Sequence, residues 1–98
     1  MKSIKNINNR IIEYSDRFIK QLTAVPDTVK AAFRDTIILF TTDPHHKSLR
    51  NHPLHGKLAG YRSIDITEDW RAVFREKQAG EGTVAYFYKI GTHRQLYA

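Results

Sequence analysis

The pattern of apolar and polar positions begins as a short strand and then changes to a helical period. Residues 10–14 (RIIEY) are rich in β-branched and aromatic side chains, which predicts the strand. Beyond it, apolar residues recur every three or four positions at Phe18, Ile19, Leu22 and Val25. This spacing predicts a helix that Ser15 or Asp16 caps and that Pro26 ends.

A second helix is expected directly after the proline, where Asp27 or Thr28 can cap it. Apolar residues again recur at helical spacing and form its buried stripe: Val29, Ala32, Phe33, Ile37 and Phe40. Residues 41–44 (TTDP) are expected to lie beyond its end, because a proline disfavours helical backbone in the residue before it. Two helices joined through one proline form a helical hairpin.

From residue 60 onward the period is that of strands. In residues 60–67 the alternation places Arg62, Ile64 and Ile66 on one face and Tyr61, Ser63, Asp65 and Thr67 on the other. Two further strands, 71–77 and 83–91, follow the turn EDW and the glycine-containing loop AGEG. Such a chain forms an antiparallel meander that has helices on one face and leaves the other face free.

These elements predict an α+β fold in which an N-terminal strand and a helical hairpin pack on a mainly antiparallel, twisted sheet. Tyr61 and Phe74 are expected in its core. A chain of 98 residues can build one core, so residues 1–98 are expected to form a single domain. The longest apolar run, 37–40, is too short to cross a bilayer, and the N-terminus lacks the apolar segment of a signal peptide. We therefore expect a cytoplasmic protein without membrane contact.

The charge is positive and unevenly distributed. Sixteen Lys and Arg against ten Asp and Glu give a formal net charge of +6, which favours polyanionic partners such as nucleic acid or an acidic protein. Residues 44–64 contain no Asp or Glu, and their basic side chains are His45, His46, Lys47, Arg50, His52, His55, Lys57 and Arg62. A solvated basic loop is the simple interpretation. The presence of four of the five histidines in this window instead indicates chemistry near neutral pH.

The histidines do not fit a metal site. A proline between His52 and His55 and a glycine after them prevent the pair from sharing one face of a helix. His45 and His46 are adjacent, which points their side chains apart. Without cysteine there is neither a disulfide nor a thiolate ligand, and Ser63 lies in no recognisable nucleophile elbow. No metal or other cofactor is expected.

Metal-free cleavage of RNA fits the residue types better. The 2′-hydroxyl of RNA attacks its neighbouring phosphate when one group takes its proton, another protonates the 5′-oxygen and cations neutralise the phosphorane. Aromatic side chains assist by stacking on splayed bases. Besides the histidines, the chain supplies Lys57, Arg62, Asp65, Asp69, Trp70, Lys89 and Tyr97 for this chemistry.

Four short motifs in a fixed order resemble a known family: HPL at 52–54, GYR at 60–62, DW at 69–70 and GTH at 91–93. Their order and spacing resemble the RelE/ParE superfamily of type II toxins and, within it, the YafQ-like mRNA interferases. The resemblance extends across the chain and implies a small RelE-like fold. It also implies a ribosome-dependent endoribonuclease that cuts mRNA in the decoding site of the 30S subunit, contacts rRNA there, and is neutralised by an acidic antitoxin.

Carried over motif by motif, the resemblance implies the functional residues His52, Asp69, Trp70, His93 and Tyr97. His93 and His52 are the expected acid–base pair, and Asp69 assists them or is itself the base. Trp70 either packs in the core or stacks on a base, and Tyr97 stacks or forms a hydrogen bond. The C-terminal tail is then expected to lie against the sheet and to bring His93 and Tyr97 to the cleavage site.

Two positions depart from the pattern of this family. Asp65 stands where YafQ-like enzymes have a second histidine, and Lys89 stands where they have an arginine before GTH. Asp65 can act as a base only where its surroundings favour the protonated form, and lysine lacks the bidentate grip of arginine on phosphate. Lys57, Arg62 and Lys89 are expected to stabilise phosphate charge. Arg62 lies on the face opposite Asp65, where contact with rRNA is its alternative role.

Two other functions stay open. A gyrase inhibitor of the ParE type shares the expected fold but does not need the histidines, so His52 and His93 argue against it. A catalytically weak relative that binds RNA or protein is the second alternative, and the departures at Asp65 and Lys89 favour it.

Overall fold

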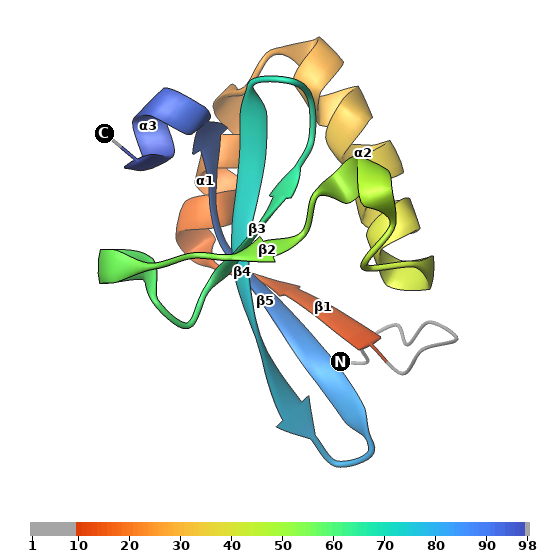
Figure 1. Ribbon diagram of the computed structural model, residues 1–98. Coiled ribbons are helices and arrows are strands. Elements are labelled where there is room, and N and C mark those ends of the chain that lie inside the picture. Colours follow the sequence, from red (N-terminus) through yellow and green to blue (C-terminus); the bar gives the residue numbers. More distant parts are fainter. Residues whose placement is uncertain (1–9, 98) are drawn as a thin grey trace.

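Residues 10–97, which the computed structural model describes, form a five-stranded sheet whose two longer helices cover one face (Figure 1). The strands are β1 (Arg10–Tyr14), β2 (His52–Pro53), β3 (Arg62–Asp65), β4 (Trp70–Ala79) and β5 (Gly82–Thr92). The helices are α1 (Asp16–Ala24), α2 (Asp27–Thr42) and α3 (His93–Tyr97), and 3₁₀ turns occur at Lys47–Leu49 and Gly56–Leu58. The predicted α+β fold is confirmed.

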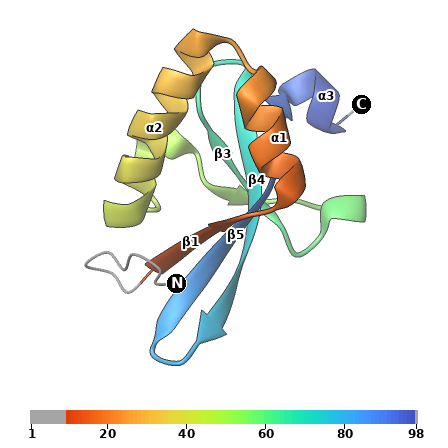
Figure 2. The ribbon, with the colours of Figure 1, turned by 180° about the vertical axis from the view of Figure 1, so that it is seen from behind.

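The strands follow the order β1-β5-β4-β3-β2, with β1 parallel to β5 and the other neighbours antiparallel. Ile64 pairs with Ala72, and Ala72 with Ile90, which forms a buried row under the helices. In the next row Asp65 pairs with Arg71 and faces the other way. Figure 2 shows α1 and α2 on the near side of the strands. We call the opposite side, which carries Asp65, the open face; the predicted alternation is confirmed.

Phenylalanine side chains form the centre of the core between the helices and the sheet. The ring of Phe87 lies 5.7, 5.5 and 5.0 Å from the rings of Phe18, Phe40 and Phe74, centroid to centroid. These side chains are fully buried. Ile19, in contrast, is 52% exposed. Ile19 fits the helical spacing of the apolar residues, but α1 turns the position after Phe18 away from the sheet.

The ends of α2 differ from the sequence-based expectation. Pro26, rather than Asp27 or Thr28, precedes the first turn, and its carbonyl accepts hydrogen bonds from the N–H groups of Val29 and Lys30 at 2.9 and 3.0 Å. The helix also continues to Thr42. Only Asp43, directly before the second proline, leaves the helical conformation, as expected of a residue in that position.

Some elements and positions could not be read from the local pattern. Tyr61 lies on the open face against Tyr88, with ring centroids 5.2 Å apart, and not in the core, whereas Phe74 is buried as predicted. The segments β2 and α3 span only two and five residues, too few for a period to appear.

Within residues 10–97, no helix combines the length and apolarity needed to cross a bilayer.

Ser15 joins the start of α1 to β5, and its replacement by alanine is expected to destabilise the fold. Its Oγ accepts a hydrogen bond from the Phe18 N–H at 2.9 Å and donates one to the Tyr88 carbonyl at 2.7 Å. Ser15→Ala is expected to lower the free energy of unfolding by about 1–3 kcal/mol, measured by urea denaturation. Thr23→Ala removes one exposed hydrogen bond from the same helix and should change it by less than about 0.5 kcal/mol. Equal losses would contradict this role of Ser15.

Candidate active site

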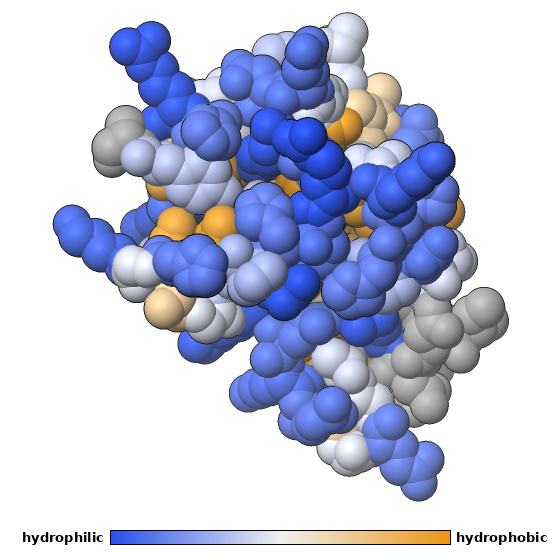
Figure 3. Space-filling view, in the orientation of Figure 1, coloured by the Kyte–Doolittle hydropathy of each residue, from blue (hydrophilic) through white to orange (hydrophobic). Residues whose placement is uncertain are grey.

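A cavity of about 380 Å³ lies where α3 meets the open face of the sheet. Side chains far apart in the sequence line it together: Arg50, His52, Pro53, Leu54, His55, Arg71, His93 and Tyr97. They come from β2 and the loops that flank it, from β4 and from α3. Figure 3 shows that hydrophilic side chains cover most of this side of the molecule. The cavity thus brings imidazole, guanidinium and phenol groups to one place.

Polar contacts hold α3 beside this cavity. The N–H of His93 donates to the carbonyl of Asp69 at 2.9 Å. The Tyr97 hydroxyl donates to Ser63 Oγ at 3.1 Å, which ties the end of α3 to β3. The rings of His93 and Tyr97 meet edge to face, with centroids 4.8 Å apart. The C-terminal tail therefore lies against the sheet and brings both rings to the cavity.

The start of α3 has its own capping arrangement. The N–H of Gln95 donates to Thr92 Oγ1 at 3.1 Å, and the N–H of Thr92 donates to Gln95 Oε1 at 2.9 Å. This reciprocal pair is a capping box, and its T-x-x-Q signature is present in the sequence. Gly91 allows the helix to approach, because a Cβ there would stand 3.1 Å from Gln95 Oε1 and 3.2 Å from Leu96 Cδ2. The capping box was the available signal for α3.

The backbone fixes the position and the ring tautomer of His52. Arg50 adopts a left-handed conformation with φ of 47°, which ends the 3₁₀ turn, and β2 then pairs His52 with Ser63. The Nδ1 atom of His52 lies 2.6 Å from the Arg50 carbonyl oxygen. Because a carbonyl oxygen only accepts hydrogen bonds, Nδ1 carries the proton. In the neutral ring, Nε2 is therefore free to accept one.

Asp65 lies between two guanidinium groups. Its Oδ2 is 2.8 Å from Arg50 Nε, and its Oδ1 is 3.0 Å from Arg71 Nε. Arg71 also donates through Nη1 to carbonyls of the turn 67–70. The Arg50 side chain is 68% exposed, and among the residues that the structure describes its Nη groups have no hydrogen-bond partner. Arg50 thus presents an unoccupied guanidinium fork at the cavity.

The structure brings part of the predicted set of site residues together. His52, His93 and Tyr97 line the cavity, and Asp65 binds two of its arginines. Asp69 adjoins the cavity through its backbone contact with His93, and its side chain is exposed. The acid–base candidates and the Asp65 carboxylate are therefore neighbours.

Lys57 and Arg62 lie outside this cavity. Lys57 is exposed in the 3₁₀ turn Gly56–Leu58 and is not one of the lining residues. Arg62 lies on the helix side of β3, where its Nε donates to Asn51 Oδ1 at 2.7 Å. Arg62 therefore steadies the loop that leads to His52.

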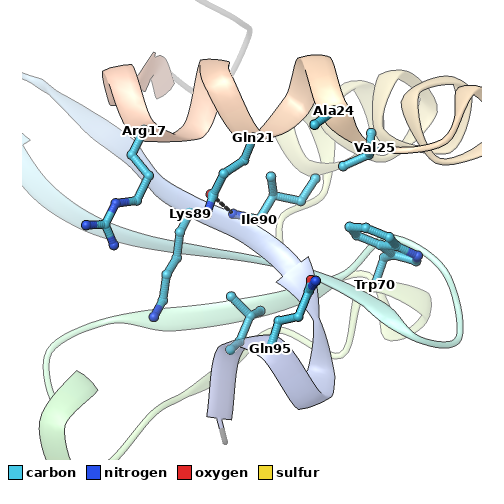
Figure 4. A pocket seen from close by; sticks show the side chains of 9 residues that line it. Arg17, Gln21, Ala24, Val25, Trp70, Lys89, Ile90 and Gln95 are labelled. Carbon is cyan, nitrogen blue, oxygen red and sulfur yellow. Dashed lines mark hydrogen bonds between the residues drawn. The ribbon is translucent and has the colours of Figure 1, made fainter.

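Trp70 and Lys89 line a separate cavity of about 440 Å³ between α1, the end of β5 and α3 (Figure 4). Trp70 is partly buried and packs against the core, which favours the structural role of the two predicted for it. Gln21 Oε1 accepts a hydrogen bond from the Ile90 N–H at 2.9 Å in the same cavity. The Ile90 N–H thus has a hydrogen-bond acceptor although β1, which pairs with β5 only as far as Phe87, ends before it.

Sequence reasoning missed Arg50, His55 and Arg71 as lining residues. Arg50 and His55 belong to the basic window, but only the folded loop shows which of its side chains face inward. Arg71 directly follows the DW motif, and its signal is the pairing with Asp65 across β3 and β4. That pairing requires the strand register, which local sequence does not specify.

The other histidines have different surroundings. His46 Nδ1 accepts a hydrogen bond from the Ser48 N–H at 3.1 Å and so caps the 3₁₀ turn, while His45 is exposed. Within residues 10–97, no group of three or more His, Asp or Glu is arranged to hold a metal ion.

Comparison with known proteins adds an independent observation. A family model described as bacterial toxin of type II toxin-antitoxin system, YafQ, matches residues 10–98. The chain is 27% identical over 92 residues to the mRNA interferase toxin YafQ of Escherichia coli K12, which covers 90% of this chain and 96% of the relative. The crystal structure of YafQ from E. coli BL21(DE3) superposes with a TM-score of 0.74 at 22% identity, covering 91% of this chain and 99% of that one. The crystal structure of the E. coli DinJ–YafQ toxin–antitoxin complex superposes with a TM-score of 0.73 at 24% identity, covering 92% of this chain and 99% of that one.

Proposed function

Because this chain belongs to the YafQ family of bacterial type II toxin–antitoxin toxins, we propose that it is an mRNA interferase. It cuts mRNA in the decoding site of the 30S subunit, in the cytoplasm, and so inhibits translation. The observation that carries the proposal is the cavity shared by His52, His93 and Arg50. These side chains supply a base, an acid and a phosphate-binding cation.

The cleavage step uses groups of this cavity. His52 Nε2 takes the proton of the 2′-hydroxyl, and the oxygen attacks the adjacent phosphorus. Protonated His93 gives its proton to the 5′-oxygen as the bond between phosphorus and that oxygen breaks. The products are one RNA end with a 2′,3′-cyclic phosphate and one with a 5′-hydroxyl.

Arg50 stabilises the negative charge of the phosphorane. Asp65 holds its Nε at 2.8 Å, which leaves the Nη groups to bind two phosphate oxygens in parallel. Asp65 Oδ2 accepts this hydrogen bond, whereas Oδ1 lies 3.0 Å from Arg71 Nε and has no hydrogen-bond partner among the described residues. In this proposal Asp65 positions Arg50 and is not the base. Asp69 and Tyr97 position His93 through the backbone hydrogen bond and the ring contact.

Arg50→Ala is expected to slow cleavage about a hundredfold, because it removes the groups that bind the phosphorane. Asp65→Asn keeps the size of the side chain but releases Arg50, and is expected to slow cleavage about tenfold, as for the loss of one charge-assisted hydrogen bond. Lys47→Ala removes an exposed cation of the neighbouring 3₁₀ turn and serves as the matched control with an unchanged rate. Single-turnover cleavage of ribosome-bound mRNA measures all of these effects.

The pH–rate profile and a double variant separate the two roles considered for Asp65. A positioning residue leaves the shape of the profile unchanged in Asp65→Asn, and the substitution costs nothing further in Arg50→Ala protein. Two results would instead identify Asp65 as the base. One is the loss of the acidic side of the pH–rate profile in Asp65→Asn, and the other is a further tenfold decrease in the cleavage rate of the double variant.

The proposed partner is an acidic antitoxin. The formal net charge of +6 favours an acidic protein, and one of the similar structures is a toxin–antitoxin complex. Co-expression with the acidic protein encoded beside the toxin is the test. Restored growth and a co-purifying complex are expected, and failure of both would contradict this partner.

Primer extension in a purified translation system tests the proposed function. New 5′ ends are expected on ribosome-bound mRNA and not on free mRNA. A protein that is toxic to cells but produces no new ends would contradict the proposal and make DNA gyrase the next target to examine.

A further inference from the structure

Tyrosine and cationic side chains alternate across the open face beside the candidate active site. We define the tyrosine–cation track as Arg17, Tyr61, Arg75, Tyr86, Tyr88 and Lys89. Tyr88 lies at its centre, with Arg17 Cζ 5.2 Å and Lys89 Nζ 5.8 Å from its ring centroid. On the open face, the ring centroids of Tyr61 and Tyr88 lie 5.2 Å apart.

Arg75 extends the track along the β4–β5 hairpin. Its Cζ lies 5.6 Å from the centroid of Tyr61 and 5.8 Å from that of Tyr86. The tyrosines are partly exposed, and Arg17 and Arg75 are exposed. Glu13 lines the adjoining groove together with Arg75 and Tyr86. Lys77, which is exposed, lines the same groove, so a carboxylate and a cation both lie beyond Arg75 and Tyr86, where we end the track.

The sheet explains why these side chains meet. Arg75 pairs with Tyr86, and a bulge beside Phe74 leaves Tyr88 without a partner in the β4–β5 register. β1 ends opposite Phe87, so Arg17 on α1 reaches over the bare edge of β5, where its Nη1 lies 3.3 Å from the Tyr88 hydroxyl. Figure 4 shows Arg17 and Lys89 extending on the same side, away from Trp70.

The track begins next to the catalytic cavity. Tyr61 precedes Ser63, the partner of the Tyr97 hydroxyl, by two residues, which is roughly 7 Å along a strand. Lys89 stands in the same cross-strand row as Ser63, through Val73. A nucleic acid strand that leaves the cavity over this face therefore meets Lys89 and Tyr61 first.

We infer that the tyrosine–cation track binds the single-stranded mRNA on one side of the cleaved bond. Aromatic rings interleaved with cations are typical of surfaces that bind single strands, because rings stack on any base while cations bind phosphates. An acidic protein would be attracted by the cations but has no comparable use for the row of rings. The inference rests on the proposed function and extends its RNA site beyond the cavity.

Fluorescence anisotropy with 2′-O-methyl RNA, which lacks the attacking hydroxyl, tests the track without ribosomes. A probe of about nine nucleotides is expected to bind at least about tenfold more tightly than one of about three nucleotides that fills only the cavity. Tyr88→Ala and Arg75→Ala should each weaken binding of the longer probe about tenfold and leave the shorter one unaffected. Arg75→Ala should also lower the salt dependence by about one counterion.

Matched controls accompany these variants. Tyr88→Phe keeps the ring, and Arg34→Ala removes an exposed cation from α2 on the helix side; both should bind the longer probe nearly as the wild type does. Thermal unfolding establishes that each variant is folded. Equal affinity of Tyr88→Ala and wild type for the longer probe would overturn the inference.

Two further outcomes would also overturn it. Normal probe affinity with weakened binding to empty 30S subunits would assign the track to rRNA, and normal affinity with loss of neutralisation would assign it to the antitoxin. The proposed function fails separately, when wild-type protein produces no cuts in primer extension. A wild-type protein that cuts mRNA, combined with unaffected probe binding in both variants, refutes the track alone.

Discussion

His93→Ala is expected to slow cleavage of ribosome-bound mRNA by a factor of about 10²–10⁴, because it removes the group that we propose as the acid for the 5′-oxygen. Growth inhibition on induction should be lost in parallel. His93 is exposed, and its backbone N–H, which contacts Asp69, is retained in the variant. The protein is therefore expected to fold normally. Single-turnover rates in the purified translation system measure the effect.

A modified substrate distinguishes the acid from other roles of this residue. A 5′-bridging sulfur leaves without protonation, so His93→Ala should cut such an mRNA at nearly the wild-type rate, while His52→Ala should not. His45→Ala, which alters an exposed histidine outside the cavity, is the control with unchanged rate. A rate of His93→Ala within about threefold of wild type on ordinary mRNA would refute its catalytic role.

Phe87→Ala is expected to remove most of the stability of the fold. The side chain is fully buried and contacts the rings of Phe18, Phe40 and Phe74. Truncation of a buried phenylalanine costs about 3–5 kcal/mol, against a total of about 5–15 kcal/mol for a domain of this size. The melting temperature should fall by at least about 12 °C, measured by circular dichroism on the toxin alone.

Conservative and exposed substitutions provide the comparison for Phe87. Phe87→Leu keeps part of the apolar volume and should cost clearly less than Phe87→Ala. Ile38→Ala alters a side chain that is 59% exposed and should change the free energy of unfolding by less than about 0.5 kcal/mol. A loss below about 1 kcal/mol in Phe87→Ala would contradict the central place of this ring in the core.

Local sequence is sufficient for most of the secondary structure. The strand 10–14, the two helices around Pro26 and the antiparallel meander all follow from patterns that repeat within about ten residues. Spacing alone does not decide which positions are buried. Ile19 fits the apolar spacing but lies outside the stripe that α1 buries, and Tyr61 alternates onto the open face. Period identifies a helix, but the packing of its neighbours selects which apolar residue is covered.

The motifs also identify some of the residues that line the site. The HPL and GTH motifs contain His52 and His93, and the structure places both at one cavity together with Tyr97. Trp70 and Lys89, which the motif pattern groups with them, line a different cavity. Trp70 and Arg71 are adjacent in β4, and adjacent residues of a strand point to opposite faces. Trp70 and Arg71 therefore line different cavities.

Sequence therefore determines the fold class and the family motifs, because these depend on residue types and on spacings along the chain. The arrangement of the charged groups depends on contacts between distant segments, which only the folded chain decides. Register sets Asp65 opposite Arg71, the left-handed turn at Arg50 brings a second guanidinium to the same carboxylate, and α3 packs over Gly91. For this reason the departure at Asp65, which in sequence suggests a substitute base, is in three dimensions an ion-pair partner of Arg50 and Arg71, and we propose that it positions Arg50 for phosphate.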